Sequence, residues 1–247
     1  MSVMGEMSHD ARTRLSRPEA SDAVVSLGWR LVLGEFRTQV LTGSLPLAAD
    51  VAARAAAVAG AQGHLRMDVR EDRVVFSLQT AEIGWVTPLD AELARQVSAV
   101  AGEFRLSTRP GADEAGINGA DRAGRPVQVL EVGIDAMDIA TIRPFWKAVL
   151  GYADEPGRSG PQDALVDPLG QGPAIWFQQM DAPRPQRNRI HFDVSVPHDH
   201  AHQRIQATVA AGGTLVYDEE APAFWVLADP EGNEACITTW QGRDSGG

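Results

Sequence analysis

The chain contains a single cysteine, Cys236, among 247 residues. One cysteine cannot form an internal disulfide, and this usage fits a reducing compartment, so we expect a cytoplasmic protein. No apolar run approaches the roughly 20 residues needed to cross a bilayer, which predicts no membrane segment. The opening stretch, MSVMGEMSHDARTRLSR, also lacks the apolar core of a signal peptide.

Basic residues are outnumbered, with 22 Lys and Arg against 33 Asp and Glu, for a net charge of −11. This balance opposes nonspecific binding to nucleic acid or to an anionic membrane surface. A phosphate-binding glycine loop and a Ser-His-Asp nucleophile elbow are also missing. A hydrophobic content of 44% suits two domains with cores of their own.

Periodicity predicts an α+β unit over residues 18–106. Apolar and polar residues alternate from His64 to Leu78 around a turn at Glu71 and Asp72, which predicts a β-hairpin. A second strand pair is expected around Gly34, between a short helix starting near Pro18 and an alanine-rich helix.

The hairpin is followed by a helix with a clear start signal. Thr87 is placed as the N-cap, Pro88 at the first helical position and Asp90 at the third. This order of elements, with GWR at 28–30 and TPLDAELA at 87–94, resembles the pterin-4a-carbinolamine dehydratases. The resemblance implies an antiparallel four-stranded sheet with helices on one face, and dehydration of 4a-hydroxytetrahydropterin without a metal or other cofactor.

That family carries a His-His-Pro motif and a third His about fifteen residues later. In this alignment His64 takes the second His position, while Gly63, Leu65 and Ala81 replace the other motif residues. Dehydration needs positioned groups that move protons, and neither glycine nor alanine can do so. We therefore expect weak or absent turnover.

The candidate catalytic residues are His64 and Asp90, and Arg66 and Asp68 are candidate ligand contacts. An alternative is that His64 is an ordinary polar strand residue and that Asp90 only caps its helix. Arg66, Asp68 or Glu82 could also substitute for the missing histidines.

Residues 107–126 are rich in Gly, Ala, Asp and Arg without apolar periodicity, and they predict a linker. Residues 1–17 and 241–247 are expected to be a disordered start and a flexible tail. Residues 127–240 are predicted to form two copies of a βαβββ unit, and one strand of the first copy is missing from the prediction. Pro144 is expected to delay or kink the first helix.

The segments FWKAVLGY at 145–152, NRIHFDV at 188–194 and DPEGNEACI at 229–237 resemble the glyoxalase-like branch of the vicinal oxygen chelate superfamily. The resemblance implies two βαβββ modules that form a cup, with four metal-ligand positions in metal-dependent members. Those positions fall on Glu131, His191, Cys236 and either Gln178 or Gln179, whose register the sequence leaves open.

A neutral amide is a poor ligand for a divalent ion, and a lone cysteine is commonly a small buried hydrophobe. We therefore expect no metal, with Glu131, His191 and Cys236 as the residues that could bind one. A metal-free cup would hold a small organic molecule through Glu131, His191, Asp193 and Trp225. Alternatively, Glu131 and His191 pair with each other or with the backbone. The HDHAH run at 198–202 is expected to be an exposed helix start.

Taken together, the sequence predicts a divergent dehydratase-like lyase carrying a glyoxalase-like binding domain. The expected partner is a small molecule, either a pterin or another heteroaromatic metabolite, and we expect a homodimer or a higher homo-oligomer. Two alternatives stay open: a noncatalytic binding or sensing protein, and a lyase or isomerase that acts through the C-terminal cup.

Overall fold

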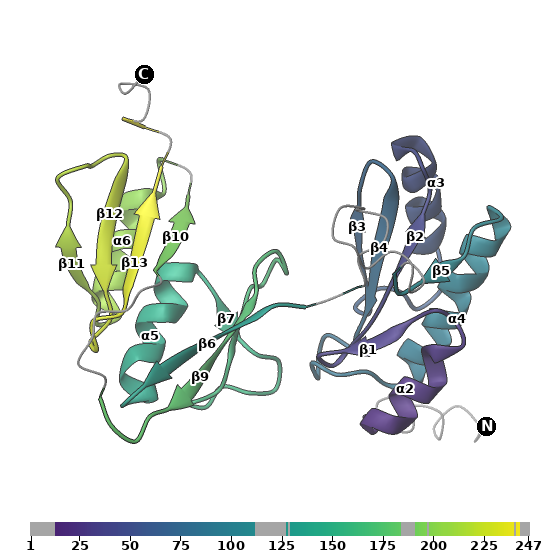
Figure 1. The fold of residues 1–247 in the computed structure, drawn as a ribbon, viewed down its shortest axis with the longest axis horizontal. Helices are drawn as coiled ribbons and strands as arrows, with labels where there is room; N and C mark the ends of the chain where they lie inside the picture. Colours follow the sequence, from purple (N-terminus) through teal and green to yellow (C-terminus); the bar gives the residue numbers. More distant parts are fainter. Residues whose placement is uncertain are drawn as a thin grey trace, which may run out of the picture. The chain divides into compact units, whose positions relative to one another are not determined.

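A computed structural model describes residues 13–111, 127, 129–183, 191–196, 198–239 and 241–242. It divides the chain into two compact units, Met1–Val129 and Leu130–Gly247 (Figure 1). The predicted linker from residue 112 onward and most of both predicted termini lie outside the described residues. No described helix is both long and apolar enough to cross a membrane.

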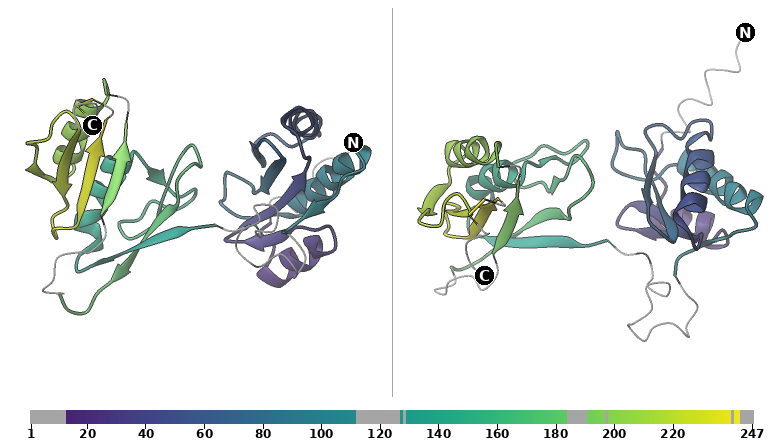
Figure 2. Two further views of the ribbon diagram at one scale, coloured as in Figure 1. Left: turned by 45° about the horizontal axis from the view of Figure 1, so that its top comes forward. Right: turned by 90° about the horizontal axis from the view of Figure 1, so that it is seen from above.

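The N-terminal unit is an antiparallel sheet with helices against one face (Figure 2). Its elements are α2 (Arg17–Val25), β1 (Arg30–Val32), β2 (Glu35–Leu41), α3 (Leu45–Ala56), β3 (Leu65–Val69), β4 (Arg73–Leu78), α4 (Pro88–Glu103) and β5 (Thr108–Arg109). The strand order is β1-β2-β4-β3, and β5 also pairs with β2. The expected four strands are confirmed, but the segment predicted as linker begins with a short fifth strand.

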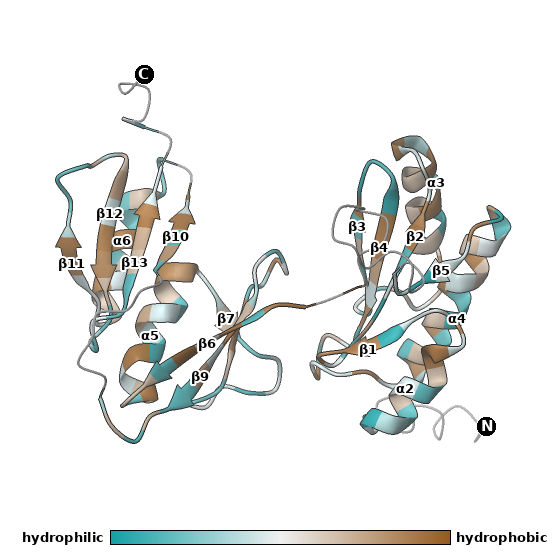
Figure 3. Cartoon of the chain, in the orientation of Figure 1, coloured by the Kyte–Doolittle hydropathy of each residue, from teal (hydrophilic) through white to brown (hydrophobic). Residues whose placement is uncertain are grey.

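The buried face of this sheet follows the predicted alternation. Phe36 and Val40 on β2 and Phe76 and Leu78 on β4 are fully buried in the helix-covered core. Burying a side chain of this size contributes about 1.5–3 kcal/mol. The turn between β3 and β4 carries hydrophilic residues, as Figure 3 shows.

The C-terminal unit contains two complete βαβββ modules. The first comprises β6 (Glu131–Ala136), α5 (Ile139–Leu150), β7 (Ala153–Asp154), β8 (Leu165–Val166) and β9 (Ala174–Gln179). The second comprises β10 (Phe192–Ser195), α6 (Ala201–Ala210), β11 (Thr214–Tyr217), β12 (Phe224–Ala228) and β13 (Glu234–Thr238). The strand missing from the sequence-based prediction is β7. In each module the first and last strands pair in parallel.

Helix α5 begins where the sequence places it, despite Pro144. Asp138 is the N-cap, its side chain accepts a hydrogen bond from the Thr141 amide, and Gly151 ends the helix in the left-handed conformation. Pro144 lies inside the helix, so the expected delay is wrong. The cap fixes the start, and proline removes only its own N–H from the backbone ladder.

Two of the segments that resemble glyoxalase-like proteins, FWKAVLGY at 145–152 and DPEGN at 229–233, contact each other in this unit. Trp146 on α5 donates its indole N–H to the Asp229 carboxylate at 3.0 Å, and Asn233 donates to the same oxygen at 2.7 Å. Glu231 accepts from the backbone amides of Met137 and Asp138. The DPEGN turn therefore connects the second module to the start of the first module's helix.

Candidate functional site

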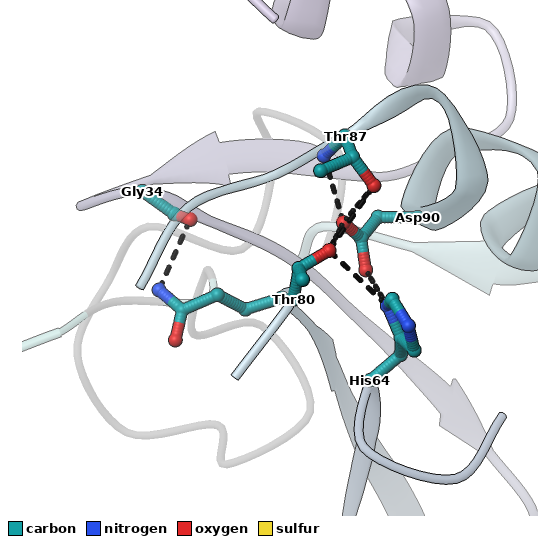
Figure 4. A network of polar contacts seen from close by, with 6 residues as sticks. Gly34, His64, Thr80, Thr87 and Asp90 are labelled. Carbon is teal, nitrogen blue, oxygen red and sulfur yellow. Dashed lines mark hydrogen bonds and ion pairs between the residues drawn. The ribbon is translucent and has the colours of Figure 1, made fainter. Parts of the chain in front are cut away.

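A histidine and a buried carboxylate meet where the β3–β4 hairpin approaches the start of α4 (Figure 4). His64 Nδ1 lies 2.8 Å from Asp90 Oδ1. The Asp90 side chain is fully buried, whereas 16% of the His64 side chain is exposed. The structure thus joins the two residues predicted as catalytic into one dyad.

The second Asp90 oxygen is held by three donors. Oδ2 accepts from the Thr87 amide at 2.7 Å, from the Thr87 hydroxyl at 2.8 Å and from the Thr80 hydroxyl at 2.7 Å. Thr87 is the N-cap of α4, as predicted. Asp90 therefore caps the helix with one oxygen and contacts histidine with the other, so the capping and catalytic interpretations are compatible.

The hydrogen bond defines which nitrogen of His64 is available. An ionised carboxylate only accepts hydrogen bonds, so Nδ1 carries the proton that points at Asp90. Nε2 is then left with its lone pair, and no residue that the structure describes forms a hydrogen bond with it. A histidine oriented in this way can accept a proton at Nε2 and return it.

The two positions of the absent histidines adjoin this dyad. Gly63 precedes His64, and its carbonyl accepts from the Ala81 amide at 3.1 Å. Gly63 has φ of +80°, and a Cβ added there would meet nothing within 4 Å. Space for a side chain exists at Gly63, but the backbone conformation disfavours any residue other than glycine.

Arg66 and Asp68 are engaged elsewhere on β3. Arg66 forms an ion pair with Glu35, and Asp68 accepts from Arg70 at 2.6 Å. Within the part of the chain that the structure describes, neither Arg66 nor Asp68 contacts His64. Their predicted role as ligand contacts stays a prediction.

In the C-terminal unit, the strand register fixes which side chains share a face. Asp135 pairs with Gln178 and Gly133 with Trp176 across β6 and β9, which leaves Gln179 on the opposite face. Gln178, and not Gln179, therefore shares a face with Glu131. The side-chain amide of Gln179 instead donates to the Met137 carbonyl at 2.8 Å.

Trp176 is a feature of this face that the sequence-based prediction missed. A Cβ added to Gly133 would lie 2.9 Å from the Trp176 ring, so the indole covers the glycine, yet Trp176 is 41% exposed. Alternation in β9 could have identified it once the register was known. Partial burial raises the pKa of Glu131 on the same face, and the charge of Glu155 adds to the effect.

The second module gathers three groups with metal-binding chemistry. His191, Asp193 and Cys236 each offer a ligand atom, and these atoms lie within 4.8 Å of one another. Burial raises the pKa of the Cys236 thiol to about 11, and its hydrogen bond to Asp193 contributes further. Glu131 is not in this group.

Trp225 has a different place from the one expected. It is 6% exposed and belongs to the core, where its ring lies 5.5 Å from that of His202 on α6. Its β13 partner is Ile237, whereas Cys236 and Asp193 pair on the other face. Trp225 therefore faces the helix and not the surface that carries His191.

The metal site implied by the superfamily resemblance does not fit these residues as a set. Its four positions divide between Glu131 and Gln178 on the first sheet and His191 and Cys236 on the second. Among the described residues, only the second pair joins a convergent group, and that group adds Asp193. The described residues therefore do not assemble a four-ligand metal centre of that kind.

Comparison with known proteins finds a family model that is similar to most of the C-terminal unit. Residues 131–238 match the glyoxalase-like domain family. The matched region covers both βαβββ modules, and it supports small-molecule binding by this unit. No curated protein matches the chain.

Among the solved structures that resemble parts of the chain, one is similar to the C-terminal unit and another to the N-terminal unit. A glyoxalase/bleomycin resistance protein/dioxygenase family enzyme from Burkholderia phytofirmans is 20% identical, with 44% of this chain and 95% of that chain covered and a TM-score of 0.37. A transcriptional coactivator/pterin dehydratase from Brucella melitensis is 29% identical, with 36% and 100% covered and a TM-score of 0.34.

Proposed function

We propose that the N-terminal unit is a hydro-lyase that dehydrates 4a-hydroxytetrahydropterins, with His64 as its proton-transfer residue. The observation that carries the proposal is the hydrogen bond from His64 Nδ1 to the fully buried carboxylate of Asp90. A buried carboxylate with four donors is rigid, and it fixes the orientation of the imidazole ring.

One histidine can serve both proton transfers in sequence. Nε2 accepts the ring N–H proton of the substrate, and the electron pair left on nitrogen forms a C=N bond as the C4a–oxygen bond breaks. The imidazolium then delivers the proton to the departing hydroxyl, which leaves as water. Asp90 acts through His64 and is a positioning residue in this scheme.

The absence of histidines at Gly63 and Ala81 predicts a modest rate. Each general acid or base contributes about a hundredfold to ten-thousandfold, so a single shuttling group forgoes part of the acceleration of a complete cluster. The remaining acceleration depends wholly on His64.

The test is a stopped-flow assay of 4a-hydroxytetrahydropterin dehydration with the full chain and with His64→Ala. We expect the unaltered protein to accelerate the reaction and His64→Ala to return it to the uncatalysed rate. His198→Ala, a histidine of the other unit, is the matched control and should keep the rate. Equal rates for the unaltered protein, His64→Ala and buffer would reject the proposal.

A second candidate function is ligand binding by the glyoxalase-like unit, supported by the exposed Trp176 between Glu131 and Asp135 on one sheet face. An aromatic surface of this kind suits a small heteroaromatic ligand. Binding would quench the Trp176 fluorescence, and a Trp176→Phe variant should lose that part of the signal. Quenching that persists in Trp176→Phe would place the ligand elsewhere.

We also propose that the chain associates with a second copy to form a homodimer. Leu215 and Val216 are 40% and 53% exposed on β11, which is one of the two edge strands of its sheet. Exposed apolar edges favour pairing with a second copy. Light scattering of the full chain and of a Val216→Lys variant tests this, because the lysine should shift the mass toward the monomer.

A further inference from the structure

We propose that His191, Asp193 and Cys236 form a binding site for one thiophilic divalent cation, with zinc as the best match, built entirely within the second βαβββ module. This inference concerns the glyoxalase-like unit, so it is independent of the dehydratase proposal.

The backbone places the three side chains on one face. Asp193 on β10 and Cys236 on β13 are direct partners in adjacent parallel strands, and His191 precedes Asp193 by two residues. Strand alternation puts residues two apart on the same side. The convergence of the three groups therefore follows from the sheet register.

The contacts connect the three groups through Asp193. His191 Nε2 lies 3.6 Å from Asp193 Oδ1, and the Cys236 thiol donates a hydrogen bond to the Asp193 carboxylate. Ligands bound tetrahedrally to zinc at about 2.0–2.3 Å are roughly 3.3–3.7 Å from one another. The observed separations of up to 4.8 Å therefore need only a small closure.

The surroundings allow this closure. The His191 and Asp193 side chains are 56% and 62% exposed and can rotate toward the ion, whereas Cys236 is 7% exposed and held by the sheet. Cys236 would act as the fixed ligand, with the other two closing from the solvent side. On coordination, the thiol proton is released to water and a metal–sulfur bond replaces the S–H bond.

The donor set determines the chemical class of the ion. Imidazole, thiolate and carboxylate together suit zinc, whereas magnesium and calcium prefer sites made only of oxygen ligands. Three protein ligands leave a fourth position open to water or to a small molecule. The site therefore has the ligand number of catalytic zinc centres.

This site differs from the arrangement that the superfamily resemblance implies. Asp193 is required here, and Glu131 on the first sheet is not. The contrast gives two carboxylates whose removal has opposite predicted consequences. Asp193→Asn and Glu131→Gln each remove one negative charge and keep a similar shape, so they form a matched pair.

The experiment is a titration of the untagged, chelator-stripped full chain with Co²⁺, followed by competition with Zn²⁺. We expect one Co²⁺ per chain and a thiolate-to-cobalt charge-transfer band. Asp193→Asn should weaken binding by more than the roughly 10–100-fold typical of losing an outer-shell partner. Cys236→Ser should remove the charge-transfer band, and circular dichroism checks that this variant is folded.

Two controls decide between this site and others. Glu131→Gln should bind Co²⁺ like the unaltered chain, and so should His198→Ala, which removes a histidine of the HDHAH run. Absence of Co²⁺ binding by the unaltered chain would overturn the proposal. So would a loss in Glu131→Gln as large as that in Asp193→Asn, or a charge-transfer band that survives in Cys236→Ser.

Discussion

Asp90 contacts His64 with Oδ1 and the first turn of α4 with Oδ2. One side chain therefore couples the stability of a helix start to the orientation of the candidate catalytic ring. A substitution of Asp90 can therefore affect the helix start, the orientation of His64 or both, because the two oxygens have different partners. Substitutions that keep one set of contacts and alter the other can distinguish the two roles.

The first prediction concerns Asp90→Asn. The asparagine oxygen can still accept from the Thr87 amide, but its NH₂ group would face His64 Nδ1 and require that atom to accept. Nε2 would then carry the proton and could no longer act as a base. We expect dehydration to fall as far as in His64→Ala, measured by stopped flow.

Thr87→Val is the control for Asp90→Asn. It removes the Thr87 hydroxyl donor at 2.8 Å and leaves the His64 contact in place. Losing a cap contact costs about 0.5–2 kcal/mol, so the urea midpoint should fall while the dehydration rate is retained. A Thr87→Val rate as low as that of Asp90→Asn would mean that the helix start, and not the tautomer of His64, controls activity.

The second prediction restores part of the missing cluster. Ala81 is exposed and lies beside Gly63, so Ala81→His adds a second proton-transfer group without disturbing the core. We expect the dehydration rate to rise, by up to about a hundredfold if the new ring reaches the substrate. Gly63→His should help less and destabilise the fold, because φ at this position is +80°.

Ala81→Gln provides a comparison of similar size without a titratable ring. A rate increase in Ala81→Gln equal to that in Ala81→His would show that bulk, and not proton transfer, is responsible. If Ala81→His also loses its gain when His64 is replaced by alanine, the two rings act together.

The sequence predicts the elements whose periodicity extends over several residues and misses two of the three shortest strands. The α+β class, the hairpin and the Thr87 cap are confirmed. Strands β5 and β7 are two residues each, which is too short for an alternation to be visible. Both are strands because a neighbouring strand offers backbone partners, which is a tertiary effect.

In the candidate sites as well, local features can be predicted from the sequence, whereas contacts between distant segments cannot. Capping by Asp90 can be predicted from the sequence because the cap involves neighbouring residues. The contact between Asp90 and His64 cannot, because the two residues are 26 positions apart and meet only when α4 packs on the sheet. Trp225, a candidate ligand contact, lies in the core, and the sequence alone does not show this because the phase of an apolar strand is ambiguous without its register. The pairing of Asp193 with Cys236 also needs the sheet, since β10 and β13 are far apart in the sequence.

The third prediction concerns acid stability of the C-terminal unit. Hydrogen bonds from Lys147 and then Arg143 lower the pKa of Asp154 below its usual value of 3.8. A lowered folded-state pKa stabilises the protein above the unfolded pKa, and this contribution is lost as pH falls through about 4 and below. We expect the denaturant midpoint of this unit to decline between about pH 5 and pH 3.

Lys147→Met isolates this effect because it removes the strongest cause and leaves Asp154 paired with Arg143 at 2.7 Å. The decline in acid should become shallower, with some stability lost at neutral pH. Asp154→Asn should flatten it further and cost more at neutral pH, since Arg143 is only 8% exposed and would lose its carboxylate. An unchanged slope in both variants would assign the acid sensitivity to other groups.

The fourth prediction concerns the reactivity of Cys236 in metal-free protein. With a pKa of about 11, the thiol is almost entirely protonated at neutral pH, so alkylation by iodoacetamide should be slow and should accelerate toward pH 11. Asp193 contributes to this through its hydrogen bond and charge, after burial. Asp193→Asn should therefore move the midpoint of the rate profile to lower pH.

The position of the midpoint is the decisive quantity, because poor access to a buried sulfur lowers the rate at every pH without moving the profile. Burial persists in Asp193→Asn, so the shift should be partial and the midpoint should remain above the roughly 8.5 of a free cysteine. Glu131→Gln, on the other sheet, should leave the profile unchanged. A midpoint near 8.5 in the unaltered chain would contradict the burial and the carboxylate contact of Cys236.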